Sequence, residues 1–239
     1  MGEPMNPRGV IIAGAHTDIG KTYTACALIR AARHAGMAVD ALKPVVSGFD
    51  ETDWRGSDPA RLLTALGREQ TPLSLAAISP WRFKAPLAPP MAAAREGRGL
   101  TLADLAGFCK AGLADSRADL MVIEGVGGLM SPIAERATGL DLMKALGLPC
   151  LLVVGSYLGA ISHGLTALET LRTHGLGVIA VVVSEDADEG APDFADTVGA
   201  FRDFADATTI LAAPRGTESP WSDELVDLLK RTSDGKREG

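Results

Sequence analysis

The sequence predicts an α/β fold with a doubly wound, mainly parallel sheet and helices on both faces. Short apolar runs alternate with segments of helical period along the whole chain. The run Leu148 to Val154 is apolar throughout, as a parallel strand covered on both faces would be. Several runs end in glycine-rich turns, where open α/β sheets build their sites. We expect residues 1–239 to form one domain, with residues 230–239 as a flexible tail.

The net charge and the lengths of the apolar runs argue against nucleic-acid and membrane partners. The 23 Lys+Arg and 30 Asp+Glu residues give a formal charge of -7, which argues against a nucleic-acid partner held mainly by charge. No apolar run reaches the roughly 18 residues of a membrane span, and the N-terminus lacks the apolar core of a signal peptide. We therefore expect a cytoplasmic protein without a membrane partner.

The three cysteines are dispersed, at Cys26, Cys109 and Cys150, without C-x-x-C spacing. This pattern fits a reducing compartment and buried packing roles better than disulfides or zinc. A catalytic thiol is the minor alternative.

A glycine-rich segment, Gly14 to Thr22, follows the first apolar run and opens a helical pattern. Glycines let the backbone turn so that amide N–H groups point at a phosphate, and the next helix offers its positive end. Lys21 and Thr22 would then reach the terminal phosphates and a magnesium ion. The segment therefore predicts a phosphate-binding loop, and with it a P-loop NTPase-like fold.

The glycine spacing of this loop is irregular. A strict pattern needs glycine five residues before Gly20, where this chain has Ala15, so Gly14 stands one residue further away. The other interpretation is a glycine-rich strand-to-helix turn with a surface lysine. A strand and a helix flank the loop, and this context favours the phosphate site.

A helix is predicted from the loop to Gly36, followed by a strand at residues 38–42. That strand ends on the segment Lys43 to Gly48, which we expect to be a fixed loop. It brings Lys43 and Ser47 to the carboxyl end of a strand, where sites form. A solvated lysine before a turn is the alternative.

Three further segments precede the next strand. Ser57-Asp58-Pro59 reads as a helix start, and Asp58 could be only its cap. Residues 70–90 match neither the helical nor the strand period, and a connection this long predicts a lid or a site wall. Thr101 and Asp104 form a capping box that starts another helix.

The apolar strand Leu120 to Ile123 runs into Glu124-Gly125-Val126-Gly127-Gly128. A carboxylate at the end of a buried strand is the expected magnesium partner in a protein with a phosphate loop. The close glycines let the backbone approach a ligand. A glycine turn with an exposed glutamate is the alternative.

The rest of the chain continues the alternation. Gly155 to His163 is a second turn of small residues into a helix, whose N-terminus predicts an anion site. His163 at this helix start is more often a structural group than a ligand or base. The other predicted elements are helix 140–146, strand 148–154, strand 178–183, helix 192–205, strand 208–211 and helix 225–229.

The predicted strand ends bring together two lysines, Lys21 and Lys43, and two carboxylates, Asp58 and Glu124. Magnesium would lie among Thr22, Asp58, Glu124 and the phosphates, and the lysines would neutralise charge on a moving γ-phosphoryl group. The set predicts phosphoryl-transfer chemistry.

Five motifs in register resemble the dethiobiotin synthetase family over residues 10 to about 185. They are Gly14-x-x-Thr17-x-x-Gly20-Lys21-Thr22, Lys43-Pro44-Val45-Val46-Ser47-Gly48, Ser57-Asp58, Glu124-Gly125-Val126-Gly127-Gly128, and Val153-Val154-Gly155 with Leu158-Gly159 and His163. The resemblance implies an ATP- and magnesium-dependent cyclo-ligase acting on 7,8-diaminopelargonate and CO₂. A carbamate and a carbamic-phosphoric anhydride are the implied intermediates.

The resemblance also implies roles for particular residues. Lys21 and Lys43 would stabilise the carbamate and the migrating phosphoryl group, while Thr17 and Ser47 would hydrogen-bond near the substrate. Members form homodimers, so Leu158, Gly159, Ala160, Ile161 and Ser162 would receive the substrate carboxylate of the partner chain. Thr22, Asp58 and Glu124 would hold magnesium. The implied nucleotide contacts are Gly14, Asp18, Ile19, Gly20, Lys21, Thr22, Glu124, Gly127, Gly128, Ser184 and Pro214.

Three positions depart from the family pattern. His16 stands where members usually have an acid, and Ser184 stands where members have an asparagine that reads adenine. The segment Leu211 to Pro214 replaces a Gly-x-Ile-Pro sequence. Because one hydroxyl replaces an amide's donor and acceptor, we expect weaker discrimination between nucleotide bases, with other nucleoside triphosphates tolerated.

Two other P-loop classes remain as alternatives. Partitioning-type ATPase switches act through protein partners and membranes, but they carry an additional lysine early in the loop, where this chain has Ala15 and His16. Amidoligases of the cobyrinate type need a source of amide nitrogen, typically a glutaminase domain, and the chain after residue 185 is too short for one.

Overall fold

A six-stranded parallel sheet forms the centre of the protein. The computed structural model describes residues 8–234, and its sheet has the strand order β10-β9-β8-β1-β5-β2. All the pairings within this sheet are parallel. The predicted doubly wound α/β class is confirmed. The strands are β1 (Arg8–Gly14), β2 (Val39–Leu42), β5 (Leu120–Glu124), β8 (Cys150–Val154), β9 (Val178–Ser184) and β10 (Ile210–Ala213).

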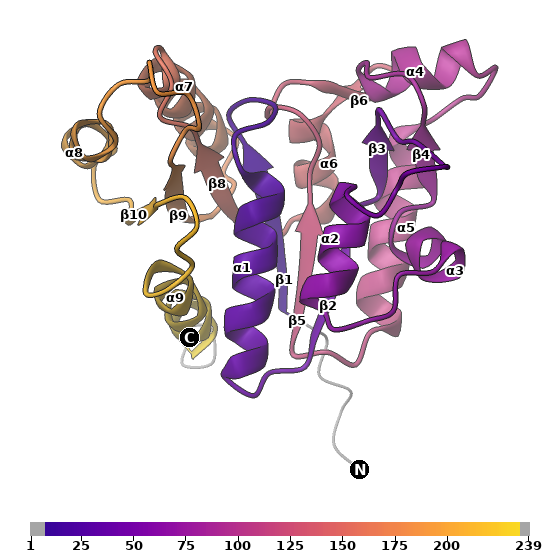
Figure 1. Cartoon of the computed structure of the whole chain (residues 1–239), viewed down its shortest axis with the longest axis horizontal. Helices are drawn as coiled ribbons and strands as arrows, with labels where there is room; N and C mark the ends of the chain where they lie inside the picture. Colours follow the sequence, from indigo (N-terminus) through magenta and orange to yellow (C-terminus); the bar gives the residue numbers. More distant parts are fainter. Residues whose placement is uncertain (1–7, 235–239) are drawn as a thin grey trace.

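Helices cover both faces of the sheet (Figure 1). On one face α1 packs between α2 and α9, and on the other α5 packs beside α6. The helices α7 and α8 contact each other beside β8 and β10. Their bounds are α1 (Lys21–His34), α2 (Asp58–Ala65), α5 (Leu102–Asp115), α6 (Gly139–Leu146), α7 (Ala160–Thr173), α8 (Phe194–Phe204) and α9 (Trp221–Asp234).

The central strands are apolar because both of their faces are covered. Every residue of β5 and of β8 is buried. Each large apolar side chain removed from water contributes about 1.5–3 kcal/mol, so a continuous apolar strand is stable only inside such a sandwich of helices. The one polar member of these two strands is Glu124, at the carboxyl end of β5. The apolar residues of these strands thus stabilise the sheet, and the single polar residue, Glu124, lies where a site is expected.

The segment at residues 70–90 has regular structure, so the prediction of an unstructured connection is wrong. Thr71 and Ser74 form a capping box with Pro72 in the first turn of α3 (Pro72–Ile78). The strand β4 (Trp81–Phe83) pairs in parallel with β3 (Val45–Ser47), which lies inside the predicted fixed loop after Lys43. Elements of three to seven residues are too short to display a period.

Three further elements complete the described chain. The helix α4 (Pro89–Arg95) follows the segment at 70–90, and β6 (Pro132–Ala134) pairs antiparallel with β7 (Ala137–Thr138). A second cluster of buried side chains lies under β3, β4, α4 and α5. This cluster supports the wall of the pocket formed by residues 86–89. The predicted wall is therefore present, built on packed elements.

The last helix is longer than predicted. The helix α9 continues to Asp234, so it reaches into residues 230–239, the segment that the sequence predicts as a flexible tail. Residues 235–239 lie outside the described residues. A basic residue, Arg231, stands in the last turn of α9, where positive charge favours the helix end. Within residues 8–234, no helix combines the length and the apolar character needed to cross a membrane.

Close packing between α7, α8 and β8 makes a stability prediction. A Cβ atom at Gly164 would lie 2.6 Å from ring carbons of buried Phe201 and 2.8 Å from Val154 Cγ1. We expect Gly164→Ala to lower the free energy of unfolding by about 1–3 kcal/mol, because a well-packed core resists extra volume. Urea denaturation measures the change.

Gly107 in α5 is the matched control. A Cβ atom at Gly107 meets nothing within 4 Å. Gly107→Ala should therefore raise the free energy of unfolding by up to about 1 kcal/mol through helix propensity alone. Equal effects of the two substitutions would contradict the packing argument.

Candidate active site

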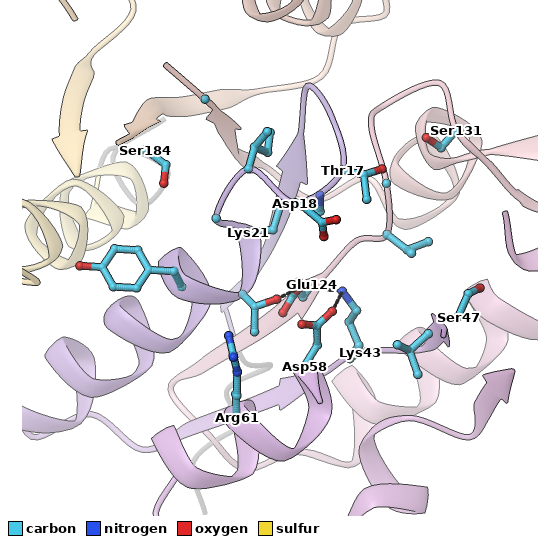
Figure 2. A pocket seen from close by; sticks show the side chains of 18 of the residues that line it. Thr17, Asp18, Lys21, Lys43, Ser47, Asp58, Arg61, Glu124, Ser131 and Ser184 are labelled. Atoms are coloured by element: carbon cyan, nitrogen blue, oxygen red, sulfur yellow. Dashed lines mark hydrogen bonds and ion pairs between the residues drawn. The ribbon is translucent and has the colours of Figure 1, made fainter. Parts of the chain in front are cut away.

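The pocket lies at the carboxyl ends of the central strands. It has a volume of about 1000 Å³ and is lined by the phosphate loop, the segment after β2, the start of α2, and the ends of β5, β9 and β10. Figure 2 shows Ser184 and Ser47 on opposite sides of a central group formed by Lys21, Lys43, Asp58 and Glu124. The pocket is therefore elongated, with charged side chains at its middle.

The phosphate loop turns through left-handed backbone conformations. Asp18 has φ 56° and Gly20 has φ 92°. Such angles are easy for glycine and tolerated by aspartate, whose short polar side chain can bond locally. Ile19 between them is 6 % exposed and fixes the loop to the core, while Thr17 and Asp18 are exposed. The loop thus presents its polar groups to the pocket.

Lys21 folds back over this loop. Its Nζ donates to the His16 carbonyl oxygen at 2.7 Å, and its side chain is 7 % exposed. A Cβ atom at Gly14 would lie 2.7 Å from Lys21 Cδ, so only glycine leaves room for this path. Burial, with the nearby Lys43 charge as a smaller cause, lowers the pKa of Lys21 to about 8. An anion beside Lys21 would raise it again.

Lys43 is the centre of a buried ion cluster. Its Nζ lies 2.6 Å from Glu124 Oε1 and 3.1 Å from Asp58 Oδ2, and it donates to the Gly125 carbonyl oxygen at 2.9 Å. Lys43 and Glu124 are each 1 % exposed. Burial by itself lowers the pKa of Lys43, but the carboxylates of Glu124 and Asp58 more than offset it and raise this pKa. Lys43 is therefore charged at neutral pH.

Three oxygen-bearing side chains meet beside this lysine. Thr22 Oγ1 donates to Glu124 Oε1 at 2.7 Å, and Glu124 Oε2 is buried without a hydrogen-bond partner. Burial alone raises the pKa of Asp58, but the Lys43 charge and a hydrogen bond from Thr22 outweigh it, so the Asp58 pKa is lowered. Asp58 is therefore ionised, although its side chain is 39 % exposed.

These residues fit a magnesium ion. Two carboxylates and a hydroxyl are oxygen ligands, and Mg²⁺ usually takes one or two carboxylates and completes its shell with water and substrate phosphates. Within residues 8–234 there is no cluster of three or more His, Cys, Asp or Glu side chains suited to a metal. A cation here would therefore depend on phosphate and water oxygens as well as on Thr22, Asp58 and Glu124. The unpartnered Glu124 Oε2 is the observation that favours one.

Ser47 offers a hydroxyl to a ligand. It ends β3 and lines the pocket, and its Oγ is buried without a hydrogen-bond partner. A buried hydroxyl left unpaired costs stability, so such an atom usually has a partner in the working state. Ser47 is on the same segment as Lys43 and lies beyond it from the phosphate loop (Figure 2).

Ser184 lies at the other end of the pocket. It ends β9 and is 8 % exposed. A Cβ atom at Gly20 would lie 2.4 Å from Ser184 Oγ, so the phosphate loop and the end of β9 are in direct contact. Ala213 and Arg215, on either side of Pro214, line the same end. Ser184 and the two neighbours of Pro214 therefore belong to one region of the pocket, whereas Pro214, a predicted nucleotide contact, does not itself line it.

Several predicted residues do not line this pocket. Gly14 packs against Lys21, and Gly128 lies beneath the loop against Ala15. The segment Leu158 to Ser162 lies outside the pocket of its own chain, and Leu158 is 88 % exposed. The remaining predicted residues that line it are Thr17, Asp18, Ile19, Gly20, Lys21, Thr22, Lys43, Ser47, Asp58, Glu124, Gly127 and Ser184.

His16 and His163 belong to one exposed aromatic group. Their rings are stacked, with centroids 5.9 Å apart and an interplanar angle of 9°. His163 Nδ1 is hydrogen-bonded to the Tyr157 hydroxyl at 2.8 Å. The structural interpretation of His163 is thus supported, and His16 gains a packing role on the start of α7.

The environment of the three cysteines disfavours the reactive thiolate. All three are free and buried, and burial raises the pKa of each thiol to about 12. The thiolate is the reactive form, so this environment makes them inert. The packing role predicted for the cysteines agrees with their burial.

Sequence reasoning missed three cationic or aromatic residues of the pocket wall, which are Tyr23, Arg61 and Arg215. Arg61 follows Asp58 by three positions on α2, so both lie on one helix face, and Arg61 extends toward the start of α1 (Figure 2). Tyr23 directly follows Thr22 and also lines the pocket. Helical spacing from Asp58 could have identified Arg61, whereas nothing local distinguishes Tyr23.

Comparison with known proteins agrees with this geometry. A protein-family profile described as an AAA domain matches residues 8–218. An ATP-dependent dethiobiotin synthetase BioD from Phenylobacterium zucineum is 55 % identical over 218 residues, covering 91 % of this chain and 93 % of the relative. The protein of that name from Caulobacter vibrioides is 53 % identical over 223 residues, covering 93 % and 99 %. The chain belongs to the ATP-dependent dethiobiotin synthetase family.

Members of the dethiobiotin synthetase family are ATP-dependent ligases, so this chain is an enzyme of that class. This identity outweighs the alternative of a partitioning-type ATPase switch. Solved structures support the fold alone. The septum site-determining protein MinD of Pyrococcus horikoshii has a TM-score of 0.54 at 14 % identity, covering 95 % of this chain and 96 % of that one. A ParA family ATPase from Chlorobium tepidum has a TM-score of 0.52 at 10 % identity, covering 95 % and 93 %.

The buried cluster predicts a large stability cost for losing its cation. We expect Lys43→Met to lower the free energy of unfolding by about 3–5 kcal/mol, because Glu124 would be left as a buried unpaired charge. Adding Glu124→Gln should recover part of this loss. Urea denaturation of the single and double variants measures both effects.

Lys84 is the control lysine. It is exposed, so Lys84→Met should change the free energy of unfolding by no more than about 0.5 kcal/mol. A similarly small effect of Lys43→Met would show that the cluster does not stabilise the fold.

Proposed function

We propose that this enzyme closes the ureido ring of dethiobiotin from 7,8-diaminopelargonate and CO₂, with ATP and magnesium. The observation that carries the proposal is one pocket holding a phosphate loop, a charged Lys43 and the unpartnered hydroxyl of Ser47. The two relatives with 55 % and 53 % sequence identity, which are named ATP-dependent dethiobiotin synthetases, support the same reaction. The family relationship shows an ATP-dependent ligase, and the particular substrates and intermediates are what we propose.

The chemistry balances in three steps. A substrate amine nitrogen attacks CO₂ and loses a proton, which gives a carbamate. A carbamate oxygen then attacks the γ-phosphorus of ATP, and ADP leaves, which gives a carbamic-phosphoric anhydride. The second amine nitrogen attacks the carbonyl carbon and loses a proton, and inorganic phosphate leaves as the ring closes. The protein's task is to position the groups and to stabilise negative charge.

The lysines carry the positive charge for these steps. Lys21, with its pKa lowered to about 8 by burial, becomes fully protonated when phosphate oxygens approach it. Lys43 is held at a fixed point by Glu124 and Asp58, and it faces the carbamate and the phosphoryl group as they combine. Fixed charges need no reorganisation during reaction, so they stabilise the transition state effectively.

Magnesium, when bound, would neutralise phosphate charge and align the β- and γ-phosphates. Thr22, Asp58 and Glu124 would hold it. Without magnesium, the charges of the two lysines and the two carboxylates at the centre of the pocket cancel one another. Ser47 would donate to the carbamate or the substrate, which gives its buried hydroxyl a partner. Thr17 would bond the substrate from the exposed side of the loop.

A second copy of the chain would complete the substrate site. The segment Leu158 to Ser162 is free of the pocket of its own chain, and Leu158 is 88 % exposed. The positive end of α7, which begins at Ala160, suits a carboxylate. In a homodimer this segment would receive the carboxylate of the partner's substrate.

Diamine-dependent carbon fixation tests the proposed function. Purified protein with labelled bicarbonate, magnesium ATP and diaminopelargonate should form acid-stable label, with one ADP per label. Ser47→Ala should raise the KM for the diamine by about threefold to tenfold, since one hydrogen bond is lost. Its free energy of unfolding should not fall, because Ser47 Oγ has no partner in the protein. Absence of diamine-dependent label would refute the reaction.

Nucleotide choice gives a separate prediction. Ser184 offers one hydroxyl where an amide would read adenine, so kcat/KM for GTP and CTP should lie within about 100-fold of the ATP value. A site built to hydrogen-bond one base would discriminate by about 10⁴ or more. Steady-state rates corrected for triphosphate hydrolysis without the diamine measure this ratio. Discrimination near 10⁴ would show that other groups read the base.

A further inference from the structure

The segment between β10 and α9, residues 214–220, forms part of the pocket wall beside Ser184. Arg215 and Gly216 from this segment line the pocket. In the proposed function this end receives the nucleoside, because the phosphate loop and Lys21 take the phosphates. How firmly the segment is held therefore bears on nucleotide affinity.

Tyr23 ties this segment to the phosphate-binding helix. Its hydroxyl lies 2.9 Å from the Thr217 carbonyl oxygen and 3.2 Å from the Pro214 carbonyl oxygen. One hydroxyl hydrogen is therefore shared between two acceptors that are three residues apart. Tyr23 follows Thr22 in α1, so the helix that starts at the phosphate loop also holds the opposite wall.

Three other contacts hold the C-terminal side of the same segment. Trp221 Nε1 donates to the Thr217 carbonyl oxygen at 2.7 Å, and the rings of Tyr23 and Trp221 lie 5.8 Å apart. Arg30 forms a two-point ion pair with Glu218, with Nε to Oε2 at 2.8 Å. These contacts fix residues 217–221 against α1 from outside the pocket.

The N-terminal side of the segment is held by other contacts. The Arg215 amide donates to Glu185 Oε2 at 2.8 Å, and the Pro214 carbonyl oxygen accepts from the Tyr23 hydroxyl and, at 3.4 Å, from the Thr217 amide. Pro214 has no amide hydrogen to donate. Tyr23 thus bonds both Pro214, which neighbours the pocket-lining Arg215, and Thr217 on the firmly held side.

We propose that Tyr23 is a positioning residue for the nucleotide: its hydroxyl fixes residues 214–217 so that they contact the nucleoside, while the polyphosphate is bound independently of it. The inference rests on the proposed placement of the base beside Ser184. It gives Tyr23 the role of positioning the wall beside the nucleoside, which neither the phosphate loop nor the metal ligands perform. Burial, and then the Glu218 carboxylate, raise the pKa of Tyr23, so the hydroxyl remains a donor through neutral pH.

Tyr23→Phe tests this role by removing only the hydroxyl. Loss of one hydrogen bond should raise the dissociation constant for magnesium ATP about threefold to tenfold in calorimetry. The dissociation constant for magnesium tripolyphosphate, which lacks the nucleoside, should not change. In turnover the KM for ATP should rise while kcat does not, and amide hydrogen exchange at residues 215–219 should accelerate.

Tyr157→Phe is the matched control, because the chain contains two tyrosines. The Tyr157 hydroxyl bonds His163 and not the pocket wall, so this variant should leave the ATP dissociation constant unchanged. Unchanged ATP affinity of Tyr23→Phe would overturn the inference, as would equal losses for ATP and tripolyphosphate. Nucleotide binding is measured without the diamine. The binding test therefore remains valid even if the protein fails to fix bicarbonate.

Discussion

The buried ion pair between Lys43 and Glu124 is the constraint on which the site depends. Both residues are 1 % exposed, and a single unpaired charge would be strongly destabilising there. The pair joins the segment after β2 to the end of β5, and these strands are neighbours in the sheet. Asp58 and Thr22 then have fixed positions, because each bonds a member of the pair. One electrostatic requirement thus sets the middle of the pocket.

The two ends of the pocket are supported in different ways. Beyond Lys43, the wall rests on a small second core under β3, β4 and α4, and Ser47 is positioned by that packing. Toward Ser184, the wall is a connecting segment held by individual hydrogen bonds from α1 and α9. Packing of buried apolar groups is rigid, whereas single hydrogen bonds to exposed segments each contribute only about 1 kcal/mol. The nucleoside end is therefore the more adjustable of the two.

Local sequence signals predicted the parts of the fold that are long or chemically marked. Apolar runs such as Leu120 to Ile123 identified the central strands, and Thr101 with Asp104 identified a helix start that the structure confirms. The short elements were missed because α3 and β4 are too short to display a period, and because β4 pairs with β3, a strand outside its own segment. The end of the last helix was predicted too early because charged residues such as Arg231, which suggest disorder, also occur in the last turn of α9.

By itself, the sequence determined the sheet class, the phosphate loop and the residues that meet in the charged centre, because strand ends of a parallel sheet converge on one edge. Only the tertiary structure decided which oxygen is left unpaired on Glu124, that Ser184 touches Gly20, and that Tyr23 holds residues 214–217. These facts depend on distances between segments as much as 194 positions apart in the chain. A local pattern carries no information about such distances, since they are set by how the layers pack.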